Sequence, residues 1–494
     1  MFCRFIILFV VVLCMGLADS SEIYLAAKKH LNAALYEDAA RDYATAIQQT
    51  PTDADAYYGR VRALLEAHHS ADAFQTADLA LKKVPDTAPA EAAAGFADIR
   101  RGEINSAEKH FRAAQKVDPQ CAAAMSGMAE IYSMVSQFAK ARDLYRAAYH
   151  AAPDDSDAML SWANTLDGAE HIAALEKVLS ILDPTTENAQ SLRAHIAHDK
   201  AVGDRKLSRL MSPYGSARVK LIRFMDGPNH SRGLGVQVRL NDKSNVKLLL
   251  DTGASGIAIS PKAAERANLR ILSAETTRAR GIGDLAPQSS LTYLADEVRA
   301  GSVIFADYPI HAFQSAKSPD FDGLIGPDVF SRFIVGIDFP NTELQLEPKR
   351  DSPVEPTGRD KPAPGFYRVF RRGNHLLLPA MINGKRLALF LIDSGSTDNM
   401  IDTATAHEVS GLSKDSGTVQ GIQGKVKQTS RADRISLTFA GFRQDNPNLL
   451  AISLEKMSDS MGVGMGGILG MPVLEHMKLT IDYREGTVRF EYKQ

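Results

Sequence analysis

Two short acidic motifs contain the residues of this sequence that are best suited to chemistry. Asp251-Thr252-Gly253 and Asp393-Ser394-Gly395 lie 142 residues apart, and each follows directly on an apolar run. Two carboxylates held side by side cannot both ionise, so they share one proton. One of them can then act as a base toward a water molecule while its protonated neighbour polarises a carbonyl group. Asp251 and Asp393 are therefore our candidates for catalysis by a pair of carboxyl groups.

The residues beside the two aspartates suit such a pair. Gly253 and Gly395 let backbone N–H groups come close to the carboxylates. Thr252 and Ser394 carry hydroxyl groups that can bond from one motif to the other and lock the two turns together. We predict that the two carboxyl groups titrate as a coupled pair.

Patterns for a metal or a nucleotide are missing from the sequence. It has no His-Glu-x-x-His, no cysteine pair with zinc spacing, no Gly-x-Ser-x-Gly and no phosphate loop. His311, His375, His407 and His476 are scattered, and we interpret them as surface or hydrogen-bonded histidines. We expect the carboxyl pair to need no cofactor and no metal.

Short apolar strands must position both aspartates. An alternating run, a short turn and an apolar run cover residues 236–250 and lead into Asp251. The same three parts cover residues 376–392 and lead into Asp393. Alternation of this kind, bounded by turn residues, is typical of β-strands. We therefore predict a β-hairpin before each aspartate.

Further features repeat after each aspartate at nearly equal distances, which indicates a duplicated β-domain. They are a glycine-rich turn about 30 residues on, a Gly-x-x-Gly run about 75 residues on and the start of a final hairpin. These pairs are Gly281-Ile282-Gly283 with Gly421-Ile422-Gln423-Gly424, Gly323–Gly326 with Gly467–Gly470, and Gly336–Phe339 with Thr480–Tyr483.

On these motifs, residues 217–494 resemble the pepsin and retropepsin family of aspartic proteases. Leu324-Ile325-Gly326 and Ile468-Leu469-Gly470 match the strands that pack beneath the catalytic turns of that family. The resemblance implies an all-β bilobal acid-protease fold made of two tandem retropepsin-like β-barrel lobes. It also implies an aspartic endopeptidase with Asp251 and Asp393 as catalytic residues, supported by Thr252, Gly253, Ser394 and Gly395.

The two glycine-rich turns resemble the flaps of these proteases, hairpins that close over a bound peptide. Gly281, Ile282 and Gly283 would form one flap, and Gly421, Ile422 and Gly424 the other, although ordinary hairpin turns have a similar composition. The flap aromatic residue of pepsin-like enzymes has no counterpart here. Two similar flaps resemble a retroviral protease dimer in one chain, so we expect a monomer with an intramolecular pseudo-dimer. Its substrate would bind as an extended peptide.

The stretch from about Ser21 to about Asp155 repeats every 34 residues and resembles the tetratricopeptide repeat, a helix-turn-helix unit. A fifth, shortened helix pair is predicted from Asp157 to Asp183, and a sealing helix from Thr186 to Val202. The repeats could bind a peptide or partner protein, or they could be a spacer. The recurring residues are Pro51, Pro85, Pro119 and Pro153; Ala39, Ala73, Ala107 and Ala141; Ala46, Ala80, Ala114 and Ala148; and Tyr43, Ala77, Phe111 and Tyr145.

The N-terminus has the pattern of a secretory signal. One positive charge, Arg4, precedes an apolar run from Phe5 to Leu17, which is short for a membrane-spanning helix. We predict a signal peptide and a secreted or periplasmic protein, with an uncleaved anchor as the alternative. Removal of the signal leaves Cys121 as the one cysteine, so no internal disulfide is expected. A net charge of −2 gives no reason to expect nucleic acid or an anionic membrane as a main partner.

These patterns divide the chain into six segments. We predict a signal peptide at 1–18, helical repeats at 21–202, a linker at 203–216, lobe 1 at 217–348, a proline-rich linker at 349–365 and lobe 2 at 366–494. The leading hypothesis is an endopeptidase. One alternative is a non-catalytic, secreted peptide-binding scaffold with a protease-like body, and another is that each lobe pairs with a lobe of a second chain.

Overall fold

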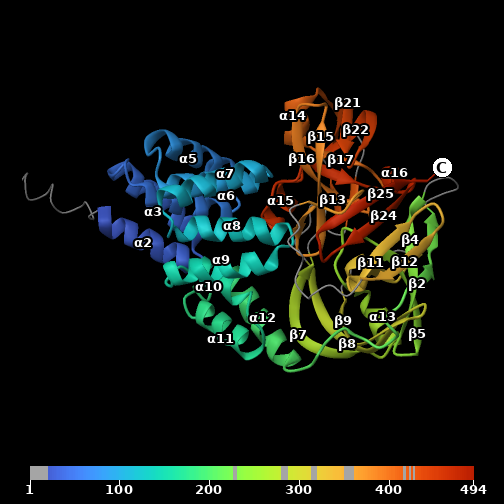
Figure 1. Cartoon of the computed structure of the whole chain (residues 1–494). Coiled ribbons are helices and arrows are strands. Elements are labelled where there is room, and N and C mark those ends of the chain that lie inside the picture. The colour runs from blue at the N-terminus through green and yellow to red at the C-terminus, as the bar shows by residue number, and fades with distance from the viewer. Residues whose placement is uncertain are drawn as a thin grey trace, which may run out of the picture.

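The computed structural model describes residues 20–225, 231–279, 288–312, 320–349, 361–415, 419–421, 424–426 and 429–493. The predicted signal peptide and most of the proline-rich linker lie outside these residues. Figure 1 shows a helical half, blue to green, beside two β-lobes, with lobe 1 in green to yellow and lobe 2 in orange to red. Within the described residues, no helix combines the length and the apolar character needed to cross a membrane.

The helical half consists of antiparallel helix pairs that follow the 34-residue period. Pro51, Pro85, Pro119 and Pro153 each stand two residues after the second helix of a pair, where proline prevents further helix. The predicted repeats are therefore confirmed. The described helices are α2 (Ser20–Asn32), α3 (Tyr36–Gln49), α4 (Ala54–Glu66), α5 (Ser70–Lys83), α6 (Ala88–Arg101), α7 (Ile104–Val117), α8 (Ala122–Met134), α9 (Phe138–Ala151), α10 (Ser156–Ala163), α11 (Gly168–Leu179) and α12 (Glu187–Val202).

Aromatic rings hold successive pairs together against glycines. Phe111 of α7 is fully buried between Gly95 of α6 and Gly127 of α8, and a Cβ on either glycine would overlap with the ring. Tyr43 of α3 lies in the same way against Gly59 of α4. The glycines therefore make room for the ring of the preceding or following helix.

The last helices close the solenoid and reach lobe 1. Helices α10 and α11 form the predicted shortened pair, and α12 is the predicted sealing helix, capped by the Thr186 side chain on the Ala189 N–H. A separate apolar cluster that includes Met159, Leu175 and Ile196 holds these three helices together. Helix α12 then packs on strand β7 (Arg270–Ala279) of lobe 1.

Both lobes are built from strands with a few short helices. The predicted linker at 203–216 is not free, because β1 within it pairs with β9 of lobe 1. The remaining elements of lobe 1 are β1 (Arg209–Leu210), β2 (Ala217–Lys220), β3 (Ile222–Met225), β4 (Ser231–Leu240), β5 (Ser244–Leu250), β6 (Ile257–Ile259), α13 (Pro261–Arg266), β8 (Gln288–Ala300), β9 (Val303–Ala312), β10 (Gly323–Ile325), η1 (Pro327–Phe330), β11 (Phe333–Asp338) and β12 (Glu343–Pro348). Those of lobe 2 are β13 (Tyr367–Arg368), β14 (Phe370–Arg372), β15 (His375–Ile382), β16 (Arg386–Ile392), β17 (Met400–Asp402), α14 (Thr403–Val409), β18 (Leu412–Asp415), β19 (Val419–Gly421), β20 (Gly424–Val426), β21 (Thr429–Phe439), β22 (Phe442–Ile452), α15 (Glu455–Met461), β23 (Gly467–Leu469), α16 (Met471–Leu474), β24 (Met477–Asp482) and β25 (Thr487–Tyr492).

The two lobes repeat one topology and share one sheet. In lobe 1 the hairpin β4–β5 leads to Asp251, and in lobe 2 the hairpin β15–β16 leads to Asp393. The final hairpins β11–β12 and β24–β25 then meet through antiparallel pairing of β11 with β24, where Gly336 faces Thr480. The hairpins predicted before each aspartate and at the end of each lobe are present, and the resulting six-stranded sheet joins the lobes.

The helical half docks on lobe 2 through the turns between the two helices of a repeat. One buried apolar cluster contains Ile99 and Ile131 of the helices together with Leu389 and Leu391 of lobe 2. Three ion pairs surround it: Arg100 with Asp459 at 3.1 Å, Arg386 with Glu103 at 2.6 Å, and Arg372 with Glu130. The repeats and lobe 2 therefore share a core.

Candidate active site

Each predicted aspartate stands at the start of a tight turn that follows a central strand. The Asp251 N–H donates to the Ile325 carbonyl at 2.9 Å, and the Asp393 N–H donates to the Leu469 carbonyl at 2.9 Å. Those carbonyls belong to β10 and β23, which run parallel to β5 and β16. The predicted supporting strands therefore lie where they fix both turns.

The structure brings the two carboxyl groups together at the interface of the lobes. Asp251 and Asp393 share a side-chain hydrogen bond. A Cβ added to Gly253 would lie 2.8 Å from Cγ of Asp393, and one added to Gly395 would lie 2.6 Å from Cγ of Asp251. Each glycine therefore makes room for the carboxyl group of the opposite lobe, so both positions require glycine.

Thr252 and Ser394 form a reciprocal set of hydrogen bonds between the lobes. The Thr252 hydroxyl donates to the Ile392 carbonyl at 2.8 Å and accepts from the Ser394 N–H at 2.8 Å. The Ser394 hydroxyl donates to the Leu250 carbonyl at 2.7 Å and accepts from the Thr252 N–H at 3.0 Å. Both side chains are fully buried, so these bonds fix the two turns relative to each other.

The surroundings favour one proton on the pair. Burial raises the pKa of Asp251 well above its ordinary value, and the nearby charge of Asp393 adds to the effect. Burial also raises the pKa of Asp393, against the N–H groups of Gly395 at 2.8 Å and Ser396 at 3.1 Å, which stabilise its anion. Asp251 accepts a comparable bond from the Gly253 N–H at 2.8 Å. Both carboxyl groups are therefore hard to ionise together, and the pair shares one proton.

Two residues that the sequence did not single out as functional also lie at this interface. The Asn374 amide donates to Ser255 and to Asp328 at 2.8 Å each, which ties lobe 2 to the loop after Asp251. Burial lowers the pKa of the neighbouring His375, whereas the charge of Asp393 and a bond to the Gly253 backbone oppose that shift. His375 is therefore no ordinary surface histidine. Its position 18 residues before Asp393, where lobe 1 has Gly233, was the available signal.

The flaps are described in part. Gly281, Ile282 and Gly283 lie outside the described residues, although the flanking strands β7 and β8 remain paired as far as Ala279 and Gln288. In lobe 2, Gly421 pairs with Gly424 across the hairpin β19–β20. Ile422, between these two glycines in the sequence, is outside the described residues. A substrate-binding role for both turns stays a prediction.

Comparisons with known proteins agree with this division of the chain. A family model described as aspartyl protease matches residues 236–329 and 378–473, and a tetratricopeptide repeat model matches residues 24–88 and 93–156. A search of curated proteins gave no match.

Similar solved structures include two repeat proteins. One is a thermophilic TPR protein of Thermus thermophilus, with 16% identity, 37% of this chain and 99% of that chain covered, and a TM-score of 0.29. The other is a tetratricopeptide repeat protein of Parabacteroides merdae, with 18% identity, 37% and 72% covered, and a TM-score of 0.25. From the family models and the fold, the chain consists of tetratricopeptide repeats followed by two tandem retropepsin-like lobes of the aspartyl protease type.

Proposed function

We propose that this protein is an aspartic endopeptidase that hydrolyses peptide bonds with a water activated between Asp251 and Asp393. The observation that carries the proposal is the pair of buried, hydrogen-bonded carboxyl groups with a raised pKa. Such a pair holds one base and one acid at the same place and at the same pH. Both are held by backbone N–H groups, so little reorganisation is needed during reaction.

The reaction would proceed through a tetrahedral intermediate. The ionised member of the pair takes a proton from the water while the water oxygen bonds to the carbonyl carbon of the peptide. The protonated member gives its proton to the carbonyl oxygen, which yields a neutral gem-diol and leaves the pair with one proton. Proton transfer to the amide nitrogen then accompanies cleavage of the C–N bond, and a diol hydroxyl returns a proton to the pair.

The substrate would be an extended segment of a protein or peptide. Among the described strands, β19 and β20 pair with each other and with no other strand, so the edges of this hairpin can pair with an extended peptide. Closure of such hairpins excludes water and strengthens the interactions of the carboxyl pair.

The test is cleavage of an unfolded protein by the purified full-length chain across the range from acidic to mildly alkaline pH. Asp251→Asn and Asp393→Asn should each reduce cleavage by about 10³-fold or more, because either change removes the acid–base pair. Asp242→Asn, at an exposed turn of lobe 1, should leave the rate unchanged. Normal cleavage by either dyad variant would refute the mechanism.

The second candidate function is a non-catalytic, peptide-binding scaffold, and a cavity on the repeats supports it. A cavity of about 90 Å³ on the first helices of the repeats is lined by Tyr58, Arg62, Glu130, Asp155 and Asp157, among others. The Arg62–Asp157 pair at 2.5 Å crosses it, and its excess of carboxylates suits a basic side chain of a partner. Tight binding of a transition-state mimic, lost in Asp251→Asn, would favour the protease over the scaffold.

We also propose that the chain is exported and acts as a monomer. The signal pattern at 1–18 and the pairing of both lobes within one chain support this. N-terminal sequencing of the mature protein and sedimentation of the active species test the two points. An uncleaved N-terminus in the cytoplasmic fraction would refute export, and activity confined to a dimer would refute the monomer.

A further inference from the structure

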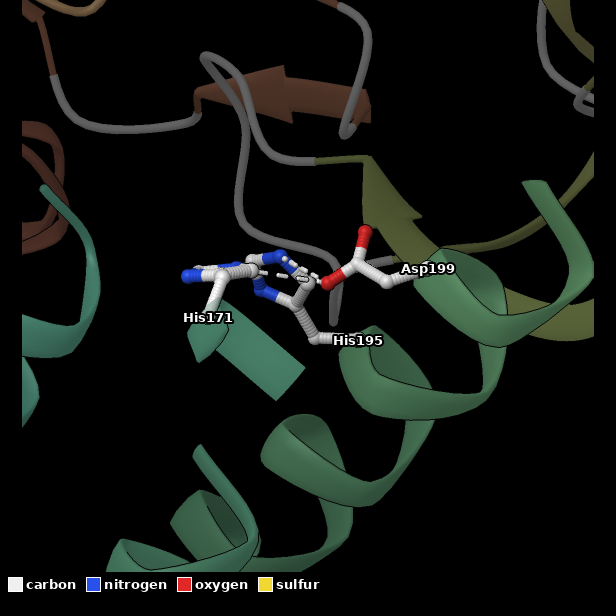
Figure 2. Close-up of side chains that lie close together, drawn as sticks. All are labelled: His171, His195 and Asp199. Carbon is white, nitrogen blue, oxygen red and sulfur yellow. Dashed lines mark ion pairs between the residues drawn. The ribbon is translucent and has the colours of Figure 1, made fainter. Parts of the chain in front are cut away.

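Two histidines and an aspartate converge between the last two helices of the repeat half. His171 lies in the first turn of α11, and His195 and Asp199 lie one turn apart on α12. Figure 2 shows both imidazole rings beside the carboxylate of Asp199, with a nitrogen of each ring facing the same Asp199 oxygen. Residues four apart on a helix project from the same face, so His195 and Asp199 form a natural pair of ligands. The site involves no residue of the Asp251–Asp393 pair.

The distances fit a small metal ion. Nε2 of His171 lies 3.4 Å from Oδ2 of Asp199, and Nε2 of His195 lies 3.2 Å from the same oxygen. Ligands about 2.0 Å from a tetrahedral zinc ion are separated by about 3.3 Å. The three ligand atoms all lie within 4.8 Å of one another. His195 is half exposed, so its ring is free to close the remaining gap and to admit an ion from solvent.

The hydrogen bonds of His171 and Asp199 favour a cation between these side chains. Nδ1 of His171 lies 2.7 Å from the Ala163 carbonyl, so Nδ1 donates to it and Nε2 is the ring nitrogen that faces Asp199. Oδ2 of Asp199 is buried and has no hydrogen-bond partner among the described residues. A buried carboxylate oxygen without a hydrogen bond is costly, and a cation bound between it and the two imidazoles would remove that cost. A carbonyl bond to the outer ring nitrogen is also the usual support of a metal-binding histidine.

The scaffold around the three residues is firm. The apolar cluster with Leu175, Val178, Leu192 and Ile196 packs α11 against α12. A second link between the helices is the Lys200–Glu176 ion pair at 2.6 Å. The ligands therefore come from elements whose spacing is already set, as a metal site requires.

We propose that His171, His195 and Asp199 bind one Zn²⁺ ion, with Nε2, Nε2 and Oδ2 as ligands and solvent in the remaining position. Two imidazoles and one carboxylate suit zinc. The ion joins α11 to α12, and α12 carries the contact with β7 of lobe 1. Its role is therefore to stabilise the end of the repeat half, and an ion that binds the folded state raises the midpoint of thermal unfolding.

The experiment uses the purified full-length chain, freed of metal with a chelator and titrated with ZnCl₂ by calorimetry. We expect one Zn²⁺ per chain and a higher unfolding midpoint with Zn²⁺ than without it. Asp199→Asn and His195→Ala should each weaken binding by about 100-fold or more and abolish the shift in midpoint. His476→Ala removes an exposed histidine that also lies near a carboxylate, and it should bind as the parent does.

Substitution of Co²⁺ provides a second readout that does not depend on stability. The parent should give the strong visible absorption of a tetrahedral cobalt site, and Asp199→Asn should lose it. Failure of the parent to bind one Zn²⁺, or equal affinity in Asp199→Asn, would overturn the proposal and leave an ordinary histidine–carboxylate cluster.

Discussion

The two lobes share one fold but differ in what covers one face of the central strands. In lobe 2, Leu389, Leu391 and Ile468 are buried in the apolar cluster shared with the helical half. In lobe 1 the exposed Lys247 stands at the position of Leu389. Leu249 stands at the position of Leu391, and it pairs with Leu324, which corresponds to Ile468. That face of lobe 1 is covered locally by Phe224 and Phe321, whose rings lie 5.4 Å apart.

This difference shows how a duplicated domain can assign different tasks to its copies. The catalytic turns need the same geometry in both lobes, so they keep the same residue types. The outer face is free to change, and a leucine in place of a lysine at one strand position turns an exposed face into a docking surface. The repeats therefore have one place to dock.

The largest loss of stability should come from replacing Leu389 of lobe 2 by lysine, the residue at the matching position of lobe 1. Leu389→Lys places a charge in the shared cluster, where Leu389 is 3% exposed, and should cost about 3–5 kcal/mol. The measurements are denaturant unfolding and limited proteolysis between the helical half and lobe 2. The reciprocal change Lys247→Leu should leave the free energy of unfolding within about 0.5 kcal/mol of the parent. Equal effects of the two changes would contradict the comparison.

A smaller loss is expected from the ion pair at the edge of the same surface. Arg100 and Asp459 are about nine-tenths buried, and Asp459 also accepts from the Ser70 hydroxyl at 3.0 Å. Asp459→Ala leaves the Arg100 charge buried without its partner and should cost about 2–3 kcal/mol. The check is a double-mutant cycle with Arg100→Met. Additive effects of the two changes would show that the pair contributes nothing to docking.

The hydroxyl groups of the catalytic turns should behave alike in the two lobes. Thr252→Val and Ser394→Ala each remove one donor and one acceptor of the reciprocal set, and each should cost about 1–3 kcal/mol. Thr252→Ser, which keeps the hydroxyl, serves as the matched control and should lose less. Unfolding curves of the three variants measure the symmetry. A cost confined to one lobe would mean that one turn holds the other in place.

The smallest effect concerns stability and pH. The pKa of Asp251 is raised on folding, so its ionisation opposes the folded state and stability falls as pH rises through that pKa. Asp251→Asn should therefore unfold at a higher temperature than the parent at neutral pH, and the difference should shrink below the ordinary pKa of an aspartate. Activity should fall over the same rising range as the pair loses its proton. A parent more stable than Asp251→Asn at neutral pH would contradict this sign.

Local patterns in the sequence predicted much of the fold. The 34-residue period located the helix pairs because each repeat makes the same packing contacts with its neighbours. The strands before Asp251 and Asp393, the supporting strands and the final hairpins followed from alternation and from spacing within each lobe. The bonds of Thr252 and Ser394 followed from their residue types next to the aspartates.

Contacts between distant parts of the chain could not be predicted in the same way. Docking of the repeats on lobe 2 depends on shape and on burial across several hundred residues, which leave no period in the sequence. His375 meets Asp393 through the register of the β15–β16 hairpin, whereas its bond to the Gly253 backbone crosses between the lobes and has no motif in the sequence. The cluster between α11 and α12 is visible only in part from the sequence, which places His195 and Asp199 four residues apart. His171 comes close to them because the two helices pack together.

The shared apolar core has a consequence for biosynthesis. Ser70 and Asp459 are bonded across 389 residues, so the helices leave the ribosome long before the strands that they will cover. Until lobe 2 is complete, the docking edge of the repeats and the face around Leu389 remain exposed to solvent and to other chains. Contacts so distant in sequence form slowly. Nascent chains of this protein should therefore depend on a holding chaperone, and a chain cut between the repeats and the lobes should aggregate rather than yield a free protease.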